Sequence, residues 1–412
     1  MNSDLRAPIR QSVQSRHDEQ IDFLAELVRV PTDNPPGDCR AHATRTLELL
    51  TKLGLEVERH EVPSEVTKDA GMKSVTNLVV RRRFGDGPTV ALNAHGDAVP
   101  PGEGWSRNPY GAEIVEGQMY GRGVAVSKSD FATYTFALLA LEEVSSSLSG
   151  TVELHFTYDE EIGGEIGPKR LLSQGISAPD YAIVAGFSYG VVTAHAGCLH
   201  LEVEICGKIA HAAMPDTGID ALEGANCVLS ALYGHRKEYG TRRSKVSGIE
   251  IPTLVIGLIE GGVNTNVVPD RVRFRLDRRL IPEETAEAVE SEIQQVISTA
   301  VSKMPGIKGS VRRLLLAHPL VPTPASERLA ALLATHGSEV IGEEIQVHGV
   351  PLYTDARHYA EQGVPTVVYG AGPRDIIEAG AHGADERLDL NDLRKATEVI
   401  ALTLADLLTG SY

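Results

Sequence analysis

The stretch TVALNAHGD, residues 89–97, joins an apolar run to a polar end and indicates the fold class. An apolar run of this length is typical of a short buried strand, and His95 and Asp97 stand where that strand should end. Two later stretches have the same design, TVELHFTYDE at 151–160 and YAIVAGF at 181–187. Helical patterns separate these runs, so the sequence predicts an α/β domain whose sheet has substantial parallel character.

The pattern changes near residue 195, where CLHLEVEICGK alternates between apolar and polar residues as a half-exposed strand does. Helices and strands then follow in the order βαββαβ, which predicts a small two-layer domain inserted into the first. We therefore expect the first domain to comprise residues 1–194 and 318–412, with the inserted domain at 195–317.

The composition argues against several classes of protein. The formal net charge of −17 disfavours a nucleic-acid partner. No run of eighteen apolar residues exists, so no membrane span is expected. The N-terminus lacks an apolar core of signal-peptide length, so we expect a cytoplasmic protein. Four cysteines form no CxxC pair and are expected to be free thiols rather than disulfides or a zinc knuckle: Cys39, Cys198, Cys206 and Cys227.

Two predicted strand ends carry side chains suited to metal-assisted hydrolysis. Ligands bind at such strand ends in α/β proteins, so His95 could bind a metal while Asp97 orients its ring. Side chains alternate in direction, so of Glu160 and Glu161 one could bind metal and the other act as general base. Taken singly, these groups are more typical of a hydrogen-bonded loop histidine and of a solvated acidic loop than of a metal site.

Two further histidines lie in loops. His382 follows the apolar stretch PTVVYGAG, residues 365–372, in a glycine-rich loop that can bring a ligand close to the backbone. His211, within CGKIAHAAMPDTGIDA, follows a strand of the inserted domain. It could serve catalysis only if the two domains face one another.

In chain order, these stretches resemble the metallohydrolase family of aminoacylases, succinyl-diaminopimelate desuccinylases, glutamate carboxypeptidases and carnosine dipeptidases. The motifs that carry the resemblance are PTDNPPGD, HGDAVPPGEGW, YGRG, DEE, GKIAHAAMP, NVVP, DRRLIP and a late histidine loop. The resemblance implies a phosphorylase/hydrolase-like catalytic domain with a mixed sheet, and a βαββαβ lid that forms a homodimer. It also implies metal-dependent hydrolysis of a C–N bond in a small substrate that bears a carboxylate.

Within the first domain, the resemblance implies a role for each polar residue. His95 resembles a metal ligand that Asp97 orients, and Glu160 resembles the general base. Glu161 and His382 resemble the ligands of a second metal.

In the lid, His211 resembles the histidine that steadies the oxyanion, typically in the partner subunit's site. Asn266 and Arg279 fall where the family binds the substrate, often at its carboxylate. An arginine suits that role because its planar guanidinium can bind a carboxylate through two hydrogen bonds.

Two positions depart from the family pattern. In GRGVAVSKSD, residues 121–130, the family places a metal-bridging aspartate where Val126 stands. After the strand YAIVAG it places an acidic ligand where Phe187 stands. Both changes remove carboxylates from the first metal, so the sequence disfavours a two-metal site.

One divalent ion, manganese or zinc, could instead be held by His95, Glu161 and His382. This His₂Glu set would leave open positions, as in water-activating zinc sites. Three nearby residues could still supply an oxygen: Ser127, Asp130 and Ser188.

A one-metal site lacks the second Lewis acid that would stabilise the tetrahedral intermediate of a peptide, which favours a small activated substrate. The branch of 5-nitroanthranilate aminohydrolase fits this expectation, because water there displaces an aromatic amine and Phe187 would give the ring an apolar wall. Two alternatives stay open: an N-acyl amino acid amidohydrolase or dipeptidase of the same family, and a metal-free pseudoenzyme that binds a small molecule.

Overall fold

The computed structural model describes residues 3–410 of the protein, and the chain divides into two compact units. The first unit comprises Met1–Thr193, Pro322–His348 and Thr354–Tyr412, and the inserted unit comprises Ala194–Val321 and Gly349–Tyr353. Within the described residues, no helix is both long and apolar enough to cross a membrane.

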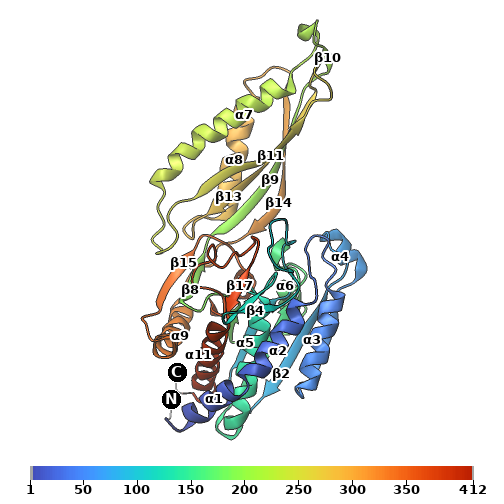
Figure 1. Cartoon of the computed structure of the whole chain (residues 1–412). Coiled ribbons are helices and arrows are strands. Elements are labelled where there is room, and N and C mark those ends of the chain that lie inside the picture. The colour runs from blue at the N-terminus through green and yellow to red at the C-terminus, as the bar shows by residue number, and fades with distance from the viewer. Residues whose placement is uncertain (1–2, 411–412) are drawn as a thin grey trace. The chain divides into compact units, whose positions relative to one another are not determined.

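A mixed eight-stranded sheet forms the centre of the first unit, which confirms the predicted fold class (Figure 1). Its middle strands β6, β3, β7 and β16 run parallel, whereas the pairs β1–β2, β2–β6 and β16–β8 are antiparallel. In sheet order the strands are β1 (Val57–Glu61), β2 (Thr76–Arg83), β6 (Thr151–Thr157), β3 (Thr89–His95), β7 (Tyr181–Val184), β16 (Thr366–Val368), β8 (Gly190–His195) and β15 (Gln346–Val350).

Helix α5 (Lys128–Leu141) lies in the core of this unit, and all of its residues are buried. A helix that is apolar on every side is stable only when other elements surround it, and α5 packs against the sheet and several helices. Phe131 of α5 stacks on Phe156 of β6 with ring centroids 4.1 Å apart. Beyond Leu141 the helix continues as a 3₁₀ turn, Glu142–Ser147.

The remaining helices of the first unit cover the sheet and its edges (Figure 1). They are α1 (Ser3–Ser15), α2 (His17–Val28), α3 (Arg40–Lys52), α4 (Ser64–Asp69), α6 (Pro168–Ser173), α9 (Pro324–Ile341), α10 (Ala356–Glu361) and α11 (Leu390–Leu408). A small sheet of β17 (Arg387–Asp389), β5 (Gln118–Tyr120) and β4 (Glu113–Val115) places the GRGVAVSKSD stretch beside the end of the late histidine loop.

The inserted unit has the predicted βαββαβ order, with a short strand pair added. Its four-stranded antiparallel sheet has the order β11-β13-β9-β14, and α7 and α8 pack on one face of it (Figure 1). The elements are β9 (Gly197–Cys206), β10 (Ala210–His211), α7 (Ala221–Arg236), β11 (Thr253–Gly261), β12 (Val267–Val268), β13 (Arg271–Leu280), α8 (Ala286–Val301) and β14 (Lys308–Ala317).

Candidate metal centre

Three parallel strands bring the predicted site residues of the first unit to one edge of its sheet. His95 is the last residue of β3 and pairs with Thr157, the last residue of β6. Glu160 begins the short turn that follows β6, and Phe187 lies just beyond β7. Because parallel strands end at the same edge, these segments meet there.

Asp97 holds the metal-binding ring in a defined orientation. The Nδ1 atom of buried His95 lies 3.3 Å from Oδ1 of Asp97 and 3.0 Å from its backbone carbonyl oxygen. This leaves Nε2 of His95 to face the acidic turn, 3.9 Å from Oε2 of Glu160. A histidine whose Nδ1 is fixed by such partners presents Nε2 to a metal.

The carboxylate of Asp97 also organises the acidic turn itself. It accepts hydrogen bonds from the backbone N–H groups of Glu160, at 3.3 Å, and Glu161, at 3.2 Å. The side-chain amide of Asn34 donates a third bond at 3.0 Å. Sequence reasoning gave Asn34 no role, although it lies in PTDNPPGD, one of the stretches that carried the resemblance.

The donor atoms of the site form one compact set. One ligand atom each from His95, Glu160 and Glu161 lies within 4.8 Å of the others. His382 joins this set through Glu161, with its Nε2 atom 3.6 Å from Oε1. The backbone of His382 has a φ of 60°, and 68% of its side chain is exposed, so it lies on the open side of the site.

Burial and neighbouring charges have opposing effects on the pKa values of Glu160 and His95, and the net effect raises both. Burial raises the pKa of Glu160 to about 8, although the neighbouring His95 opposes this shift. Burial disfavours the charged form of His95, but the carboxylates around it, Glu160 foremost, hold its pKa well above the usual value. A hydrogen bond to Glu161 raises the pKa of His382. Raised pKa values mean that these groups tend to hold protons. A divalent cation bound here would displace those protons.

The three residues considered as substitutes for the missing bridging aspartate each form hydrogen bonds with the backbone. The hydroxyl of Ser127 donates to the carbonyl of His95 at 2.8 Å and accepts from its N–H at 2.9 Å. The hydroxyl of Ser188 donates to a backbone carbonyl at 2.9 Å. Asp130 is fully buried, and its Oδ1 accepts the N–H of Ala371 at 2.7 Å. Oδ2 of Asp130 has no hydrogen-bond partner among the described residues, so a ligand role for Asp130 stays a prediction.

Two positions where the family pattern has carboxylate ligands hold apolar residues in this chain. Val126 and Phe187 are both half-buried and carry no ligand atom. Phe187 pairs through its backbone with Gly372, beyond the end of β16. The resemblance implied a first metal held by His95 and by carboxylates at these two positions. Of these three residues, only His95 can bind a cation.

Asp355 is an acidic residue that sequence reasoning missed. It lies directly before α10 and is 2% exposed, and its Oδ2 atom has no hydrogen-bond partner among the described residues. Burial, and then the charge of Glu160, raises its pKa well above the usual value. In the sequence, the one feature that could have indicated a role for Asp355 is its acidic side chain within the stretch YTDARHY.

A buried ion pair ties the His382 loop to the GRGVAVSKSD stretch. Nη1 of Arg122 lies 2.7 Å from Oε2 of Glu386, and both side chains are at most 3% exposed. Arg122 also donates to the backbone carbonyl of Gly383 at 2.7 Å, next to His382. The carboxylate of Glu386 accepts two further backbone N–H groups, so the pair fixes the backbone on both sides.

Replacing this arginine is expected to be strongly destabilising. Arg122→Met should lower the free energy of unfolding by about 3–5 kcal/mol, because Glu386 would remain buried without its partner. Arg82→Met is the control, since its ion pair with Glu142 is exposed and should contribute at most about 1 kcal/mol. Urea unfolding of both variants measures the difference, and equal losses would contradict the bracing role of Arg122.

Three predicted site residues lie in the inserted unit: His211, Asn266 and Arg279. His211 is exposed on β10, which pairs with β12, and its Nδ1 accepts the N–H of Ala213 at 3.0 Å. The carbonyl of Asn266 accepts the N–H of Ala212 at 3.0 Å, so His211 and Asn266 belong to one loop cluster. Arg279 lies near the other end of the unit's sheet, at the end of β13 that is distant from Asn266.

A mixed sheet with histidine and acidic side chains at the ends of its parallel strands, and an inserted βαββαβ unit, defines the protein as a metallohydrolase. The model of Peptidase family M20/M25/M40 matches residues 91–406. The chain therefore belongs to this family, and it is a metal-dependent hydrolase of C–N bonds.

Individual relatives agree with this assignment. Acetylornithine deacetylase of Myxococcus xanthus is 29% identical over 346 residues, which are 83% of this chain and 86% of the relative. Succinyl-diaminopimelate desuccinylase of Wolinella succinogenes is 28% identical over 340 residues, 80% of this chain and 87% of the relative.

Solved structures share the fold. An M20 family metallo-carboxypeptidase from Sulfolobus solfataricus has a TM-score of 0.77 at 18% identity, covering 96% of this chain and 100% of that one. Human carnosine dipeptidase 1 has a TM-score of 0.72 at 17% identity, with coverages of 97% and 98%.

Proposed function

We propose that the protein uses one divalent ion to hydrolyse the amide C–N bond of a small N-acylated substrate that bears a carboxylate. The observation that carries the proposal is the donor cluster of His95, Glu160 and Glu161, with Val126 and Phe187 where further carboxylate ligands would be needed. The names of the relatives, a deacetylase and a desuccinylase, support an N-acyl substrate.

His95, Glu161 and His382 would hold the ion, manganese or zinc, which would polarise the scissile group and make a nearby water more acidic. Glu160 acts as the general base: it takes the proton of the attacking water and passes it to the departing amine. Burial raises its pKa, which favours uptake of a proton from the attacking water. Asp97 keeps His95 oriented throughout.

Residues of the inserted unit complete the proposal. Arg279 binds the substrate carboxylate through its guanidinium, and Asn266 contributes a further polar contact. His211 steadies the negative charge that develops on the scissile oxygen. The exposure of His211 and Asn266 leaves both side chains accessible to a substrate.

Phe187 favours a second candidate reaction, the displacement of an aromatic amine by water. Its ring is half-buried at the strand ends and would offer an apolar wall to an aromatic substrate. An electron-poor ring would accept the negative charge that a second metal otherwise stabilises.

Two assays separate the candidates. The protein loaded with manganese or zinc is given N-acetyl and N-succinyl amino acids, and release of the free amine is followed. In parallel it is given 5-nitroanthranilate, and ammonia is measured. Amine release with no ammonia supports the first candidate, whereas the reverse supports the second. Activity on neither substrate class, with metal bound, would contradict both.

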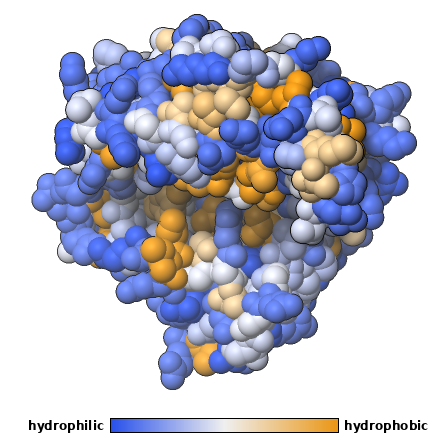
Figure 2. Space-filling model, turned by 90° about the horizontal axis from the view of Figure 1, so that it is seen from above, coloured by the Kyte–Doolittle hydropathy of each residue, from blue (hydrophilic) through white to orange (hydrophobic). Residues whose placement is uncertain are grey.

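We further infer that the protein forms a homodimer through the inserted unit. Strand β11 is the edge of its sheet, so one row of backbone groups is unpaired there. Three apolar side chains of β11 are more than half exposed: Val255 at 53%, Leu258 at 61% and Ile259 at 55%. In Figure 2, apolar patches interrupt the otherwise hydrophilic surface that is seen from above.

The dimer can be tested at this edge. Leu258→Glu should convert a dimer into a monomer, because it would bury a charge in the interface. Light scattering after size exclusion gives the mass, and Ile114→Glu, on an exposed strand of the first unit, should leave it unchanged. A monomeric wild-type protein would contradict the proposal.

A cytoplasmic location is part of the proposal. All four cysteines are free thiols, as expected in a reducing compartment. The net charge of −17 further supports a small-molecule substrate over a nucleic-acid partner.

A further inference from the structure

The inserted unit brings a cysteine, a histidine and an aspartate together on two neighbouring strands. The register of β9 and β13 places His200 opposite Asp277, and Cys198 opposite Arg279. One ligand atom each of Cys198, His200 and Asp277 lies within 4.8 Å of the others. None of the motifs that assigned the metal centre of the first unit includes this cluster.

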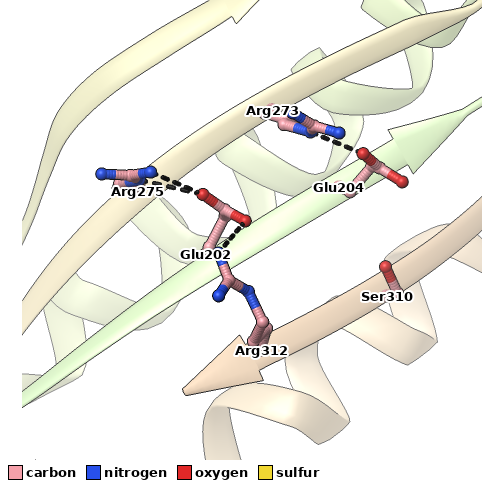
Figure 3. Close-up of a pocket in the computed structure, with 6 residues that line it drawn as sticks. All are labelled: Glu202, Glu204, Arg273, Arg275, Ser310 and Arg312. Carbon is pink, nitrogen blue, oxygen red and sulfur yellow. Dashed lines mark hydrogen bonds and ion pairs between the residues drawn. The ribbon is translucent and has the colours of Figure 1, made fainter. Parts of the chain in front are cut away.

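These three residues lie on the sheet face that α7 and α8 leave open. Side chains alternate along β9, so Leu199 and Leu201 enter the core while Cys198 and His200 point the other way. Further along that face, acids and arginines are paired: Glu202 with Arg275 and Arg312, and Glu204 with Arg273 (Figure 3). Asp277 continues this pattern through its ion pair with Arg279, but Cys198 and His200 add sulfur and nitrogen donors at the same place.

We propose that Cys198, His200 and Asp277 bind a zinc ion, separate from the ion of the first unit. Nε2 of His200 lies 3.1 Å from Oδ2 of Asp277, and Sγ of Cys198 lies 3.9 Å from the same oxygen. With zinc–sulfur bonds of about 2.3 Å and zinc–nitrogen or zinc–oxygen bonds of about 2.0–2.2 Å, tetrahedral ligand atoms are about 3.3–3.6 Å apart. The observed separations differ from these by a few tenths of an ångström, so small side-chain movements suffice.

The surroundings of the three residues suit a bound cation. Cys198 is buried, whereas the side chains of His200 and Asp277 are 37% and 31% exposed, which leaves a solvent side for entry and for a water ligand. Nε of Arg279 donates to Oδ1 of Asp277 at 2.9 Å, and Nη2 donates to Oδ2 at 3.1 Å, so zinc binding at Oδ2 would replace the second of these bonds and keep the first. Such an outer hydrogen bond holds a ligating carboxylate in place. The mixture of thiolate, imidazole and carboxylate favours zinc over magnesium or manganese.

Cobalt(II) is the probe that tests this site, because a bound thiolate gives cobalt a near-ultraviolet charge-transfer band. The full-length protein, reduced and stripped of metal, is titrated with cobalt(II). We expect the band in the wild type and its loss in Cys198→Ser. Cys198→Ser removes a ligand itself. Its cobalt affinity should therefore fall by more than the roughly 10–100-fold that loss of a hydrogen-bond partner of a ligand costs. Cys206→Ser is the matched control, since Cys206 lies on the same face of β9, and the band should remain.

The test also separates the two metal sites. The band should persist in His382→Ala, because the ligands proposed for the first unit include no cysteine. His200→Ala should also lose the band, and it replaces Cys198→Ser in the test if that variant does not fold. Absence of the band in the wild type, or its survival in Cys198→Ser or His200→Ala, would overturn the proposal and leave a simple ion pair of His200 with Asp277. Neither outcome depends on whether the proposed hydrolysis occurs.

Discussion

Glu160→Gln is expected to abolish hydrolysis while the protein keeps its metal. Glutamine matches glutamate in shape but cannot accept the proton of the attacking water, and loss of a general base costs about 10²–10⁴-fold in kcat. The proposed metal ligands His95, Glu161 and His382 are unchanged, and Asp97 still fixes His95. Turnover of the best N-acyl amino acid and elemental analysis of the same preparation measure both quantities.

A matched control for this substitution lies in the same loop. Glu165→Gln alters an exposed glutamate that pairs with Lys169, and it should leave both kcat and metal content unchanged. If Glu160→Gln remained active, Glu160 would have no part in the proton transfer. If it lost the metal as well, Glu160 would be a ligand, and the assignment of base and ligand within the acidic pair would be reversed.

The metal content of the wild type is expected to be one ion per chain in the first unit, and Val126→Asp with Phe187→Glu should raise it to two. These substitutions return carboxylates to the positions where the family pattern has metal ligands. Both side chains are half-buried, so the new carboxylates would be poorly solvated, which favours their binding a cation. Elemental analysis of protein reconstituted with zinc or manganese measures the change.

Zinc bound at the proposed cysteine-containing site would add to the measured metal content. These measurements are therefore made on protein that also carries Cys198→Ser. Val126→Asn with Phe187→Gln is the matched control, because it adds amides of the same shape without the charge and should leave one ion. His382→Ala should remove that ion. Two ions with Val126 and Phe187 in place would contradict the one-metal proposal, and would point to a buried carboxylate such as Asp130, whose Oδ2 has no hydrogen-bond partner among the described residues.

Much of the fold could be predicted from local patterns. The strands that end at His95 and before Glu160, and the βαββαβ order of the inserted unit, follow from apolar periodicity, which reflects which side of each element is buried. Helix α1 (Ser3–Ser15) was not predicted, because its sequence is polar on average and contains Pro8. Ile9 and Val13 are nonetheless buried, so packing rather than propensity stabilises that helix.

The sequence by itself determined most of the chemical groups that the site contains. The order of its motifs indicated the family, and the substitutions at Val126 and Phe187 indicated a reduced metal set. Both inferences depend on residue types at particular positions, and these are fully present in a linear chain.

Only the tertiary structure decided which of these groups contact one another. It shows that Asp97 holds both His95 and the acidic turn, and that one carboxylate oxygen of Asp130 accepts a backbone N–H group. It also shows that Cys198 and Asp277, far apart in the sequence, meet on adjacent strands. The physical reason is that strand register and loop packing are set by the burial of the whole core, and local sequence patterns do not specify such long-range contacts.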